Sequence, residues 1–455
     1  MAAEEEECPA QVVIAGAGIV GLVLALALHE HVGIKAELYE RAPAFHEDVG
    51  AGMGMYPNGL RVIRDISPSL FDTIRDSGHP YLLRRFERHD GTEVAVGDED
   101  VLYPDDPTLQ SIGIRRWRLQ RALYDAATDA GIKVNFGKRL TQVTIRDDKL
   151  VEIAFEDGTK RLTEILFGAD GNKSKVREIM ARKAPDLEGK VPHLEYTGVT
   201  CIMGMANSGR EFKGICFPSA ATTKCHACYF PTGEEEQCFQ IHFPIPAEKA
   251  DQGSWGTLRE KVAKEECCKL ADRLREDGWD EKYLAPLKEV THSVRIGFCS
   301  LTPRLEKWVY EDQVILLGDA AHPPVPYTGQ GAQVGIEDAG VIALLMKRLC
   351  LDDNGTFQKS NFGNAMKIYE KMRIPRVKEI QEISENWGCM QQKRAENAKY
   401  NLVKEEKIRR DVFFHLTLPT MFPGVNYDYK ADVEEVLQVT PVLLAKLSEG
   451  EESRD

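Results

Sequence analysis

The sequence has no excess of positive charge and no apolar run of ordinary membrane-spanning length. Its formal net charge of −14 over 455 residues argues against a general binder of nucleic acid or anionic membranes. The one apolar candidate, residues 12–28, contains 17 residues, whereas a spanning helix needs about 20. The glutamates at positions 4–7, directly before it, have the wrong sign for a secretory signal. We therefore expect a cytoplasmic protein with no transmembrane segment and no nucleic-acid partner.

The sequence also lacks the cysteine patterns that disulfide frameworks or zinc sites require. Its 11 cysteines are odd in number and scattered, and without a secretory signal we expect reduced thiols. Cys225 and Cys228 form a CxxC, but no second CxxC or HxxxH supplies two further zinc ligands. A thioredoxin-like setting is missing too. We interpret the pair as strand residues and expect no metal site.

Internal repeats and low-complexity segments are absent as well, which excludes repeat architectures and long disordered regions. The chain is 43% hydrophobic and 29% charged, a composition typical of globular proteins. Its length allows two or three packed domains.

The clearest positive signal lies between residues 11 and 41. Residues 12–14 are an apolar, β-branched run that predicts a buried parallel strand, and GAGIVG follows at positions 16–21. An apolar segment to residue 28 predicts a helix, and residues 36–39 predict a second strand that ends at Glu40. This order of strand, turn, helix and strand indicates a βαβ unit.

In such a unit the three glycines have separate functions. Gly16 permits the tight turn, Gly18 lets the backbone approach a pyrophosphate, and Gly21 allows close packing of helix on strand. The helix N-terminus offers unpaired N–H groups to phosphates. Glu40 follows Gly21 by 19 residues, where a carboxylate can accept hydrogen bonds from ribose hydroxyls. The unit predicts dinucleotide binding without choosing between FAD and NAD.

Three further loops have more glycine, proline or acidic residues than plain connections need. Residues 42–58, before a helix expected near Gly59, favour a cofactor-facing loop. Asp170 follows a predicted strand and is either a turn residue or a carboxylate beside a ligand. Asp319 also follows a predicted strand, and the loop after it leads into a helix whose N-terminus can stabilise negative charge.

The alternation of strands and helices predicts an α/β fold with an α+β insertion. We expect a Rossmann-like nucleotide-binding domain, a mixed-sheet substrate domain and a C-terminal helical region. The predicted substrate domain contains short strands between residues 196 and 244 and a helix over 254–276. The expected limits are 1–190 and 298–350 for the two parts of the nucleotide-binding domain (with strands from 75–112 available to the substrate domain), 191–297 for the substrate domain and 351–455 for the helical region, with helix over about 359–410.

Three motifs in this order resemble a known family. They are GAGIVG at 16–21, GADGNKSKVR at 168–177 and GDAAHPPVPYTGQGAQVGIEDA at 318–339. The arrangement closely resembles the class A, single-component FAD-dependent monooxygenases, which include salicylate hydroxylase, para-hydroxybenzoate hydroxylase and related epoxidases. The resemblance covers about three-quarters of the chain and implies that the Rossmann-like domain binds FAD.

The resemblance also implies a set of cofactor contacts. The fingerprint glycines and Glu40 would bind the ADP part of FAD, Arg116 would contact FAD, and Asp319 would bind the ribityl hydroxyls. The Asp170-Gly171 pair resembles a motif associated with both FAD and nicotinamide-nucleotide binding. The loop at 326–332 would lie beside the isoalloxazine, and residues 50–52 with Pro57 and Asn58 would shape the flavin's mobile position. The expected cofactor-binding residues are Gly16, Gly18, Ile19, Val20, Gly21, Glu40, Arg41, Gly50, Ala51, Gly52, Arg116, Asp170, Gly171, Asp319, Pro326, Gly329, Gln330, Gly331 and Ala332. Gln333 departs from the family, which often has Asn there, and its longer amide is expected to bond differently.

The implied activity is insertion of one oxygen atom of O2 into a small aromatic or polyunsaturated substrate, by hydroxylation or epoxidation. NADPH or NADH would reduce FAD, and the reduced flavin and O2 would form a C4a-hydroperoxide that transfers its distal oxygen. The absence of a second strand–GxGxxG–helix unit argues against two-domain monooxygenases and reductases, and the WxWxIP pattern of flavin halogenases is absent too.

Catalytic side chains on the substrate side cannot be assigned from the sequence. Tyr229, His242 and Tyr327 are pocket candidates, with a core or surface position equally open for each. His226 and His292 are isolated in the sequence, and we expect structural or exposed positions for them. Two rival functions remain open: a flavoprotein dehydrogenase or reductase on the same fold, and a non-enzymatic FAD-binding protein. Either a monomer or a homodimer is compatible with the sequence.

Overall fold

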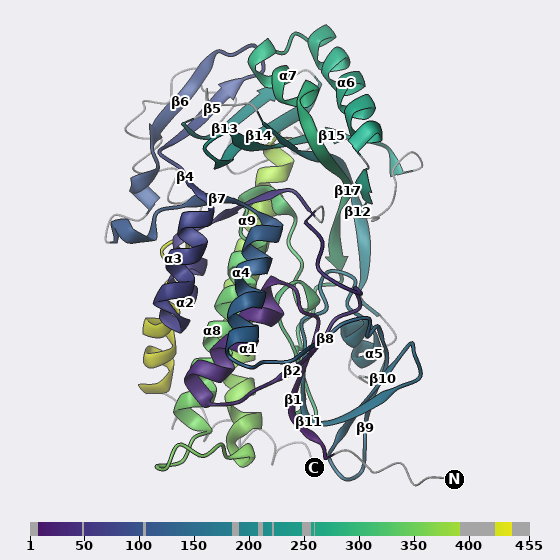
Figure 1. The fold of residues 1–455 in the computed structure, drawn as a ribbon, viewed down its shortest axis with the longest axis vertical. Coiled ribbons are helices and arrows are strands. Elements are labelled where there is room, and N and C mark those ends of the chain that lie inside the picture. Colours follow the sequence, from purple (N-terminus) through teal and green to yellow (C-terminus); the bar gives the residue numbers. More distant parts are fainter. Residues whose placement is uncertain are drawn as a thin grey trace.

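The computed structural model describes residues 8–47, 50–102, 106–183, 191–207, 213–220, 223–247, 256–258, 260–391 and 424–438. These residues form an elongated molecule with a mostly parallel sheet towards one end and a mixed sheet at the other. Long helices run between the two sheets (Figure 1). This arrangement confirms the predicted α/β fold with a mixed-sheet insertion and a helical region after it.

Strand β1 lies in the middle of the first sheet, between β11 and β2. Its β-branched residues Val12, Val13 and Ile14 are buried, as expected for a central parallel strand. Five strands run parallel in the order β19-β11-β1-β2-β8. Their bounds are β1 Ala10–Ala15, β2 Glu37–Tyr39, β8 Val134–Asn135, β11 Lys160–Gly168 and β19 Val314–Leu316, with β18 Val309–Tyr310 antiparallel at one edge and the antiparallel strands β9 Leu140–Ile145 and β10 Val151–Phe155 extending from the first half of β11.

Helices cover this sheet on both faces. The predicted helix after GAGIVG is present as α1, and its near-complete burial explains why its sequence is apolar all round. The helices of this part are α1 Ile19–Val32, α2 Pro57–Ile66, α3 Pro68–Ser77, α4 Arg116–Asp129, α5 Lys175–Lys183 and α8 Gly331–Leu349. None of the helices in the described ranges combines the length and apolarity that a bilayer crossing needs.

The segment before α2 differs from the expected loop. Strand β3, Gly52–Met55, lies inside it and pairs with β7, Ile112–Arg115, which also pairs with β4, His79–Pro80. Helix α2 begins at Pro57 rather than near Gly59, because proline is favoured in the first turn of a helix, where its missing N–H would be unpaired anyway.

The second sheet is mixed and contains eight strands in the order β16-β17-β12-β15-β14-β13-β5-β6. Their bounds, with two covering helices, are β5 Leu83–Arg88, β6 Glu93–Asp98, β12 His193–Ala206, β13 Gly214–Ala220, β14 Cys225–Gly233, β15 Glu236–Pro244, β16 Gly256–Leu258, β17 Val290–Thr302, α6 Glu260–Glu276 and α7 Glu281–Lys288. The helix expected from residue 254 begins only at Glu260, since residues 256–258 pair with β17.

Two details of this sheet bear on the expected domain limits. Strands β5 and β6 come from the segment 75–112, and β17 runs through the expected limit at residue 297. Sheet pairing therefore joins residues from both sides of these limits, and the division into domains stays a prediction.

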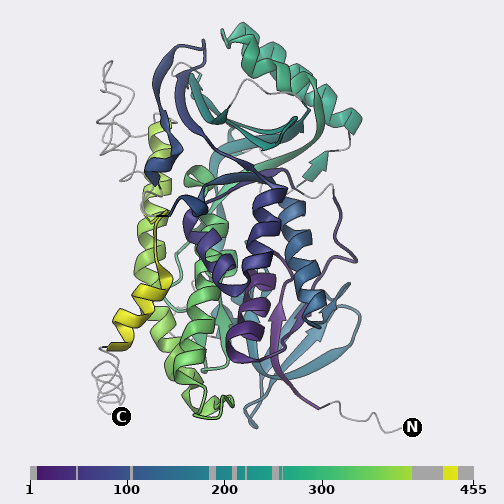
Figure 2. The ribbon, with the colours of Figure 1, turned by 60° about the vertical axis from the view of Figure 1, so that its left-hand side comes forward.

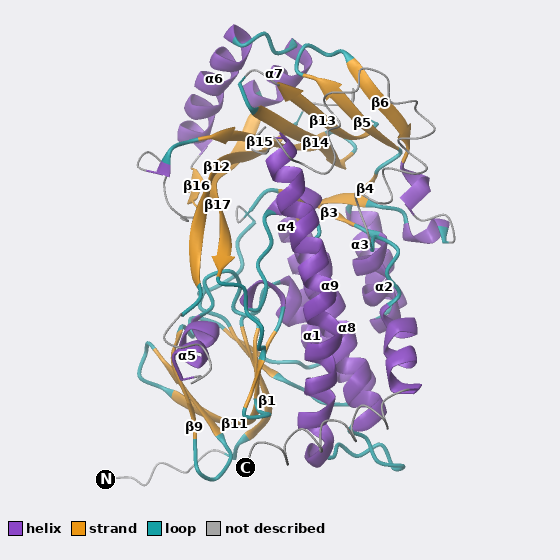
Figure 3. Cartoon of the chain, turned by 180° about the vertical axis from the view of Figure 1, so that it is seen from behind, coloured by secondary structure: helices purple, strands orange, loops and turns teal. Residues whose placement is uncertain are grey.

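Helices α6 and α7 cover one face of the mixed sheet, and the other face looks towards the rest of the molecule (Figure 3). Alternation along β14 assigns its side chains to the two faces. Cys225 and Tyr229 pack in the cluster with α6 and α7, whereas Cys228 and Phe230 pack on the opposite side. The CxxC cysteines are strand residues, as expected, and they lie in hydrophobic clusters on opposite faces of the sheet.

Helix α9, Phe362–Gln391, connects the two sheets. Near its start, Phe362 packs edge-on against Phe167 of β11, with ring centroids 6.1 Å apart. Near its end, Trp387 stacks on Phe86 of β5, also at 6.1 Å. The segment 424–438 lies along α9 (Figure 2). The predicted helix over 359–410 is confirmed as far as residue 391, and its remainder lies outside the described residues.

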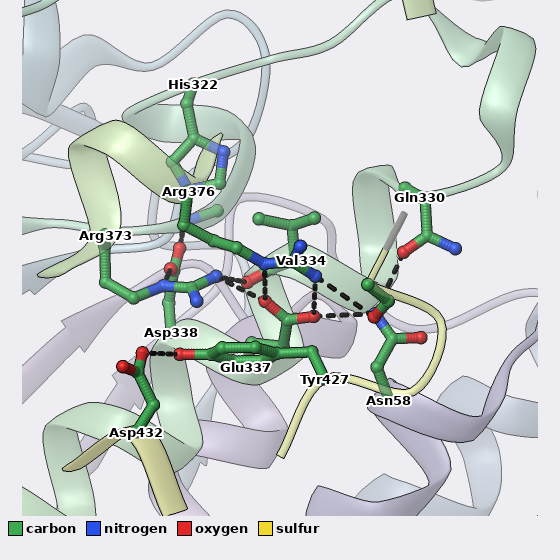
Figure 4. Close-up of polar contacts among 12 residues, drawn as sticks. Asn58, His322, Gln330, Val334, Glu337, Asp338, Arg373, Arg376, Tyr427 and Asp432 are labelled. Atoms are coloured by element: carbon green, nitrogen blue, oxygen red, sulfur yellow. Dashed lines mark hydrogen bonds and ion pairs between the residues drawn. The ribbon is translucent and has the colours of Figure 1, made fainter. Parts of the chain in front are cut away.

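A buried network of charges, which we call the α8–α9 network, joins these two helices (Figure 4). It consists of Glu337 and Asp338 in α8 and Arg373 and Arg376 in α9. Arg373 donates to Glu337 Oε2 and to Asp338 Oδ1, each at 2.7 Å, and Arg376 donates to Glu337 Oε1 at 3.0 Å. Burial opposes ionisation of both carboxyls, but the charges around them, chiefly Arg373 for Glu337 and His322 for Asp338, hold each pKa below its ordinary value.

We expect Arg373→Met to lower the free energy of unfolding by about 3–5 kcal/mol, because it removes the main counter-charge of the buried Glu337 and one ion-pair partner of the buried Asp338. Urea denaturation followed by circular dichroism measures the change. The matched control is Arg348→Met, which removes an exposed ion pair with Glu434 and should cost about 0–1 kcal/mol. Equal losses in the two variants would contradict a special role for the α8–α9 network.

Candidate active site

Four predicted site residues or motifs follow the carboxyl ends of four neighbouring parallel strands. Glu40 follows β2, Gly16 follows β1, Asp170 follows β11 and Asp319 follows β19. Parallel strands present their carboxyl ends at one edge of a sheet, where open α/β sheets bind ligands. The structure therefore brings together residues that are 303 positions apart in the sequence (16 to 319).

The glycine-rich turn has the backbone geometry that a bound pyrophosphate requires. Gly16 adopts a φ of +101°, and a Cβ there would lie 2.5 Å from the carbonyl oxygen of Ala169. A Cβ on Gly21 would lie 2.1 Å from the carbonyl oxygen of Gly16, whereas a Cβ on Gly18 would meet no atom within 4 Å. No side chain in the described part of the chain caps the N-terminus of α1. The turn thus leaves open space before unpaired N–H groups, and this fits the phosphates of FAD.

Glu40 lies beside this turn. Its carboxylate accepts hydrogen bonds from the backbone N–H groups of Ala17 at 3.0 Å and Ala42 at 2.9 Å, which hold the side chain at the end of β2. Each carboxylate oxygen retains further lone pairs for a ribose hydroxyl. Arg41, the next residue in the chain, is exposed. The side chain of Val20 packs against Gly318 and Gly335.

Arg116 begins α4 and lies near two of the strand-end carboxylates. Its backbone N–H donates to the carbonyl of Ala51 at 2.9 Å. Gly50 has a φ of +85°, and a Cβ there would lie 2.9 Å from Arg116 Cδ, so this loop packs directly on the arginine. Burial lowers the pKa of Arg116 while the charges of Asp319 and Glu40 oppose the shift. The expected loop at 50–52 and the expected arginine therefore form one unit.

Asp170 caps a helix. Its carboxylate accepts from Ser174 Oγ at 2.5 Å and from the backbone N–H groups of Lys175 at 2.7 Å and Val176 at 3.1 Å, at the start of α5. Ser174 accepts in turn from the N–H of Arg177 at 2.9 Å, which confirms the predicted cap. Gly171, at φ +81°, has open space around its Cα, so the backbone of this turn stays accessible. A direct contact of Asp170 with the cofactor remains a prediction.

Arg177 links the second motif to the third, a role that sequence reasoning missed. Its guanidinium donates to the carbonyl oxygens of Asp319 at 3.2 Å, Ala320 at 2.9 Å and Asn172 at 2.6 Å. The Asp319 side chain is accessible to solvent, yet enclosure by protein raises its pKa, while the neighbouring groups of His322, Arg116 and Arg177 oppose the shift. Arg177 is the last residue of the 168–177 motif, and its place in that motif was the sequence feature that could have indicated a role in the site.

The loop before α8 is held from behind by the α8–α9 network. The Asn58 amide donates to Gln330 Oε1 at 2.9 Å and to Glu337 Oε1 at 2.6 Å (Figure 4). Gly329 has a φ of +65°, and no side chain of a described residue caps the N-terminus of α8. The N–H groups of Gly331 and Ala332 therefore point out of the helix start without a protein cap, where they can stabilise negative charge.

Gln333 serves a structural contact. The buried amide donates to the carbonyl of Gly54 at 2.9 Å and accepts from the backbone N–H of Tyr56 at 3.4 Å. It joins α8 to the segment between β3 and α2. How the longer amide bears on the flavin, compared with the family's usual Asn, stays a prediction.

A pocket lies between the mixed sheet and the loop at 326–329. It encloses about 520 Å³ of space not filled by protein atoms, part of it open to solvent. Its lining is mostly aromatic and apolar. The lining residues are Gly54, Tyr56, Tyr81, Ile215, Phe217, His226, Ala227, Cys228, Phe230, Gln240, His242, Pro326, Tyr327, Thr328 and Gly329.

The structure separates the three pocket candidates. His242 and Tyr327 line the pocket. Tyr229 does not: it packs against the helices on the opposite face of the mixed sheet and donates to the carbonyl of Tyr283 at 2.8 Å. The prediction for Tyr229 was wrong because its position in β14 is one residue out of phase with the pocket-facing set. His292 also has a partner, since its Nε2 lies 2.5 Å from the carbonyl oxygen of Gly50.

His226, expected to be isolated, lies directly opposite His242 in the pairing of β14 with β15. Their ring centroids are 4.4 Å apart, and none of their four ring nitrogens has a hydrogen-bond partner among the described residues. Burial lowers the pKa of His242 to about 3 and that of His226 well below its ordinary value, with His242 adding to the second shift. Both rings are neutral at pH 7, and each unsatisfied buried group costs about 1–3 kcal/mol.

Known proteins are similar to this chain in sequence and in fold. A family model described as "FAD binding domain" matches residues 9–376. A 6-hydroxynicotinate 3-monooxygenase of Bordetella bronchiseptica is 28% identical over 390 residues, covering 82% of this chain and 90% of that protein. A salicylate hydroxylase of Pseudomonas putida is 28% identical over 456 residues, covering 93% of each. The solved structure of Klebsiella pneumoniae HpxO with FAD and uric acid superposes with a TM-score of 0.73 at 21% identity, covering 90% of this chain and 96% of that chain.

The fold, the strand-end site and the matched family define a flavoprotein, and the chain belongs to the FAD binding domain family. Within it, the chain is an FAD-dependent monooxygenase of the class A type, as the sequence motifs indicated.

Two glycine variants should distinguish a glycine that leaves room for the cofactor, Gly18, from a glycine that allows close packing, Gly21. Gly18→Ala adds a methyl group in open space, so we expect normal folding with FAD affinity reduced about tenfold or more. Gly21→Ala forces a carbon against the Gly16 carbonyl, so we expect lower thermal stability even without FAD. Flavin fluorescence titration and melting of the FAD-free protein measure the two effects, and a Gly18→Ala protein with lower stability but full FAD affinity would contradict the assignment.

Gly331→Leu should abolish FAD binding. A Cβ at this position would lie 3.2 Å from Pro324 Cγ and 3.9 Å from Asp319 Oδ1, so a larger side chain enters the space before the start of α8. The variant should be colourless after incubation with a flavin concentration that saturates the wild type and removal of the unbound flavin. A yellow, fully active variant would show that the cofactor does not occupy this space.

Proposed function

We propose that this protein hydroxylates a ring of a small aromatic substrate held in the pocket at the mixed sheet, with FAD at the strand-end site and NAD(P)H as reductant. The observation that carries the proposal is the shared loop. Residues 326–329 line the pocket, and the same loop leads directly into the uncapped N-terminus of α8 beside Asp319. A substrate in the pocket would therefore lie next to the part of the cofactor site nearest this loop.

The cofactor role of the strand-end residues is part of the proposal. Gly16, Gly18 and Gly21 would hold the pyrophosphate, Glu40 the adenosine ribose, and Arg116 and Asp319 the central part of FAD. Bound FAD supplies the reduction by NAD(P)H and the activation of O2, which side chains alone do not provide. The protein's own part is to bind, orient and shield.

The residues of this chain would control two things: the negative charge on the reduced cofactor and the access of water to the reacting atoms. The unpaired N–H groups at Gly331 and Ala332, with the positive end of the α8 dipole, would stabilise negative charge on the reduced cofactor. The aromatic lining, including Tyr56, Phe217 and Phe230, would keep bulk water from the reacting atoms. The two relatives named above act, by their names, on a nicotinate ring and on salicylate, and this supports an aromatic substrate here.

We expect a matching aromatic compound to accelerate NAD(P)H oxidation by the FAD-loaded protein with little release of hydrogen peroxide. The assay would use a panel of phenols, hydroxypyridines, aromatic acids and indoles, with NADH and NADPH tested separately. Mass spectrometry after reaction under ¹⁸O₂ should find one labelled oxygen in the product. Product formation without label would contradict oxygen insertion and favour a dehydrogenase, and a panel without any acceleration would count against an aromatic substrate.

A further inference from the structure

The two histidines of the pocket offer a matched set of hydrogen-bonding groups that no described residue uses. His226 and His242 are only 2% and 5% exposed, and their ring nitrogens have no partner among the described residues. A neutral imidazole carries one N–H donor and one acceptor nitrogen, so the pair presents two donors and two acceptors. Buried polar groups are nearly always satisfied in proteins, so an unpaired set in a pocket indicates a ligand that completes it.

The neighbours of the pair are aromatic. The ring of Tyr327 lies 5.6 Å from that of His226 and 6.0 Å from that of His242, and Phe298 lies 5.1 Å from His242. No Lys or Arg is among the described residues that line the pocket. The nearby Arg84 is paired with Glu99, with a nitrogen–oxygen distance of 2.7 Å and both side chains fully buried. Among the residues that the structure describes, the pocket thus has no free cation to balance an incoming anion.

These two features distinguish between ligand classes. A ring hydroxyl or ring lactam both donates and accepts, so it can donate to one imidazole and accept from the other. A carboxylate only accepts, so it leaves the acceptor nitrogens unpaired, and it brings a buried charge with no counter-ion.

We propose that His226 and His242 act together as specificity-determining residues that select an uncharged ring bearing a hydroxyl or lactam group over an aromatic carboxylate. The proposal rests on the proposed function for the place of the substrate and adds its chemical class. It also assigns the reason for two adjacent neutral histidines: they complement a group that is donor and acceptor at once.

The test measures, by isothermal titration calorimetry, how tightly three matched ring compounds bind to the FAD-loaded protein. The probes are 4-methylphenol, its methyl ether and 4-methylbenzoate. We expect the phenol to bind at least about tenfold more tightly than either of the others, since each loses a hydrogen bond or gains an unpaired charge. Equal or tighter binding of the benzoate or the ether, or no binding of the phenol, would overturn the proposal.

Variants connect the preference to the two histidines. His242→Phe and His226→Phe should each weaken phenol binding about tenfold or more while changing binding of the ether less than about threefold. His242→Gln keeps a donor and an acceptor and should restore most of the phenol affinity, a rescue that a purely structural role would not give. The matched control is His193→Phe, the same substitution at an exposed site in β12. An unchanged preference in both pocket variants would overturn the proposal even if both fold normally.

The same three compounds separate this proposal from the proposed function. Selective phenol binding without faster NAD(P)H oxidation would support the selection by the histidine pair and contradict hydroxylation at this pocket. Faster NAD(P)H oxidation with the benzoate alone would support a monooxygenase acting on aromatic substrates and contradict the selection.

Discussion

The ion pairs between Glu337 and Asp338 of α8 and Arg373 and Arg376 of α9 connect most of the parts on which the site depends. The carboxylates lie in consecutive positions of a buried helix, and each holds a different segment. Asp338 accepts from the backbone N–H of Gly318 at 2.9 Å and contacts His322 in the turn after β19. Glu337 accepts from Asn58, which also bonds Gln330. One buried network therefore determines the position of the 318–322 turn and of the loop before α8.

The network also links the site to the second sheet. Helix α9 carries both arginines and reaches the mixed sheet through Trp387. The ring of Tyr427 covers Arg376 at 4.4 Å, and the Tyr427 hydroxyl donates to Asp432, so the segment at 424–438 closes the network on its outer side (Figure 4). Buried charges of this kind seldom add net stability relative to an apolar core. Here they give defined geometry at the junction between two sheets.

The parts of the site differ in how far sequence reasoning could predict them. The glycine-rich turn was predictable because Gly16, Gly18 and Gly21 have local steric functions, and the structure shows a separate backbone reason for each. Ser174 was predictable as a cap because its capping hydrogen bond joins residues only three positions apart. Arg177 was missed although it lies inside a motif, because two of its three carbonyl partners are more than 140 positions away. Tyr229 was placed wrongly because a strand's face depends on its register against its neighbours.

The sequence by itself determined the βαβ unit, because that unit depends on contacts between residues close together in the chain. It also determined the order of the three motifs, and with that order the family. Tertiary structure alone decided which residues share the pocket. His226 and His242 are 16 positions apart and meet only because β14 and β15 pair with these two residues opposite each other. A neutral, unpaired imidazole pair is a property of burial and register, and neither is encoded by the residues next to a histidine in the chain.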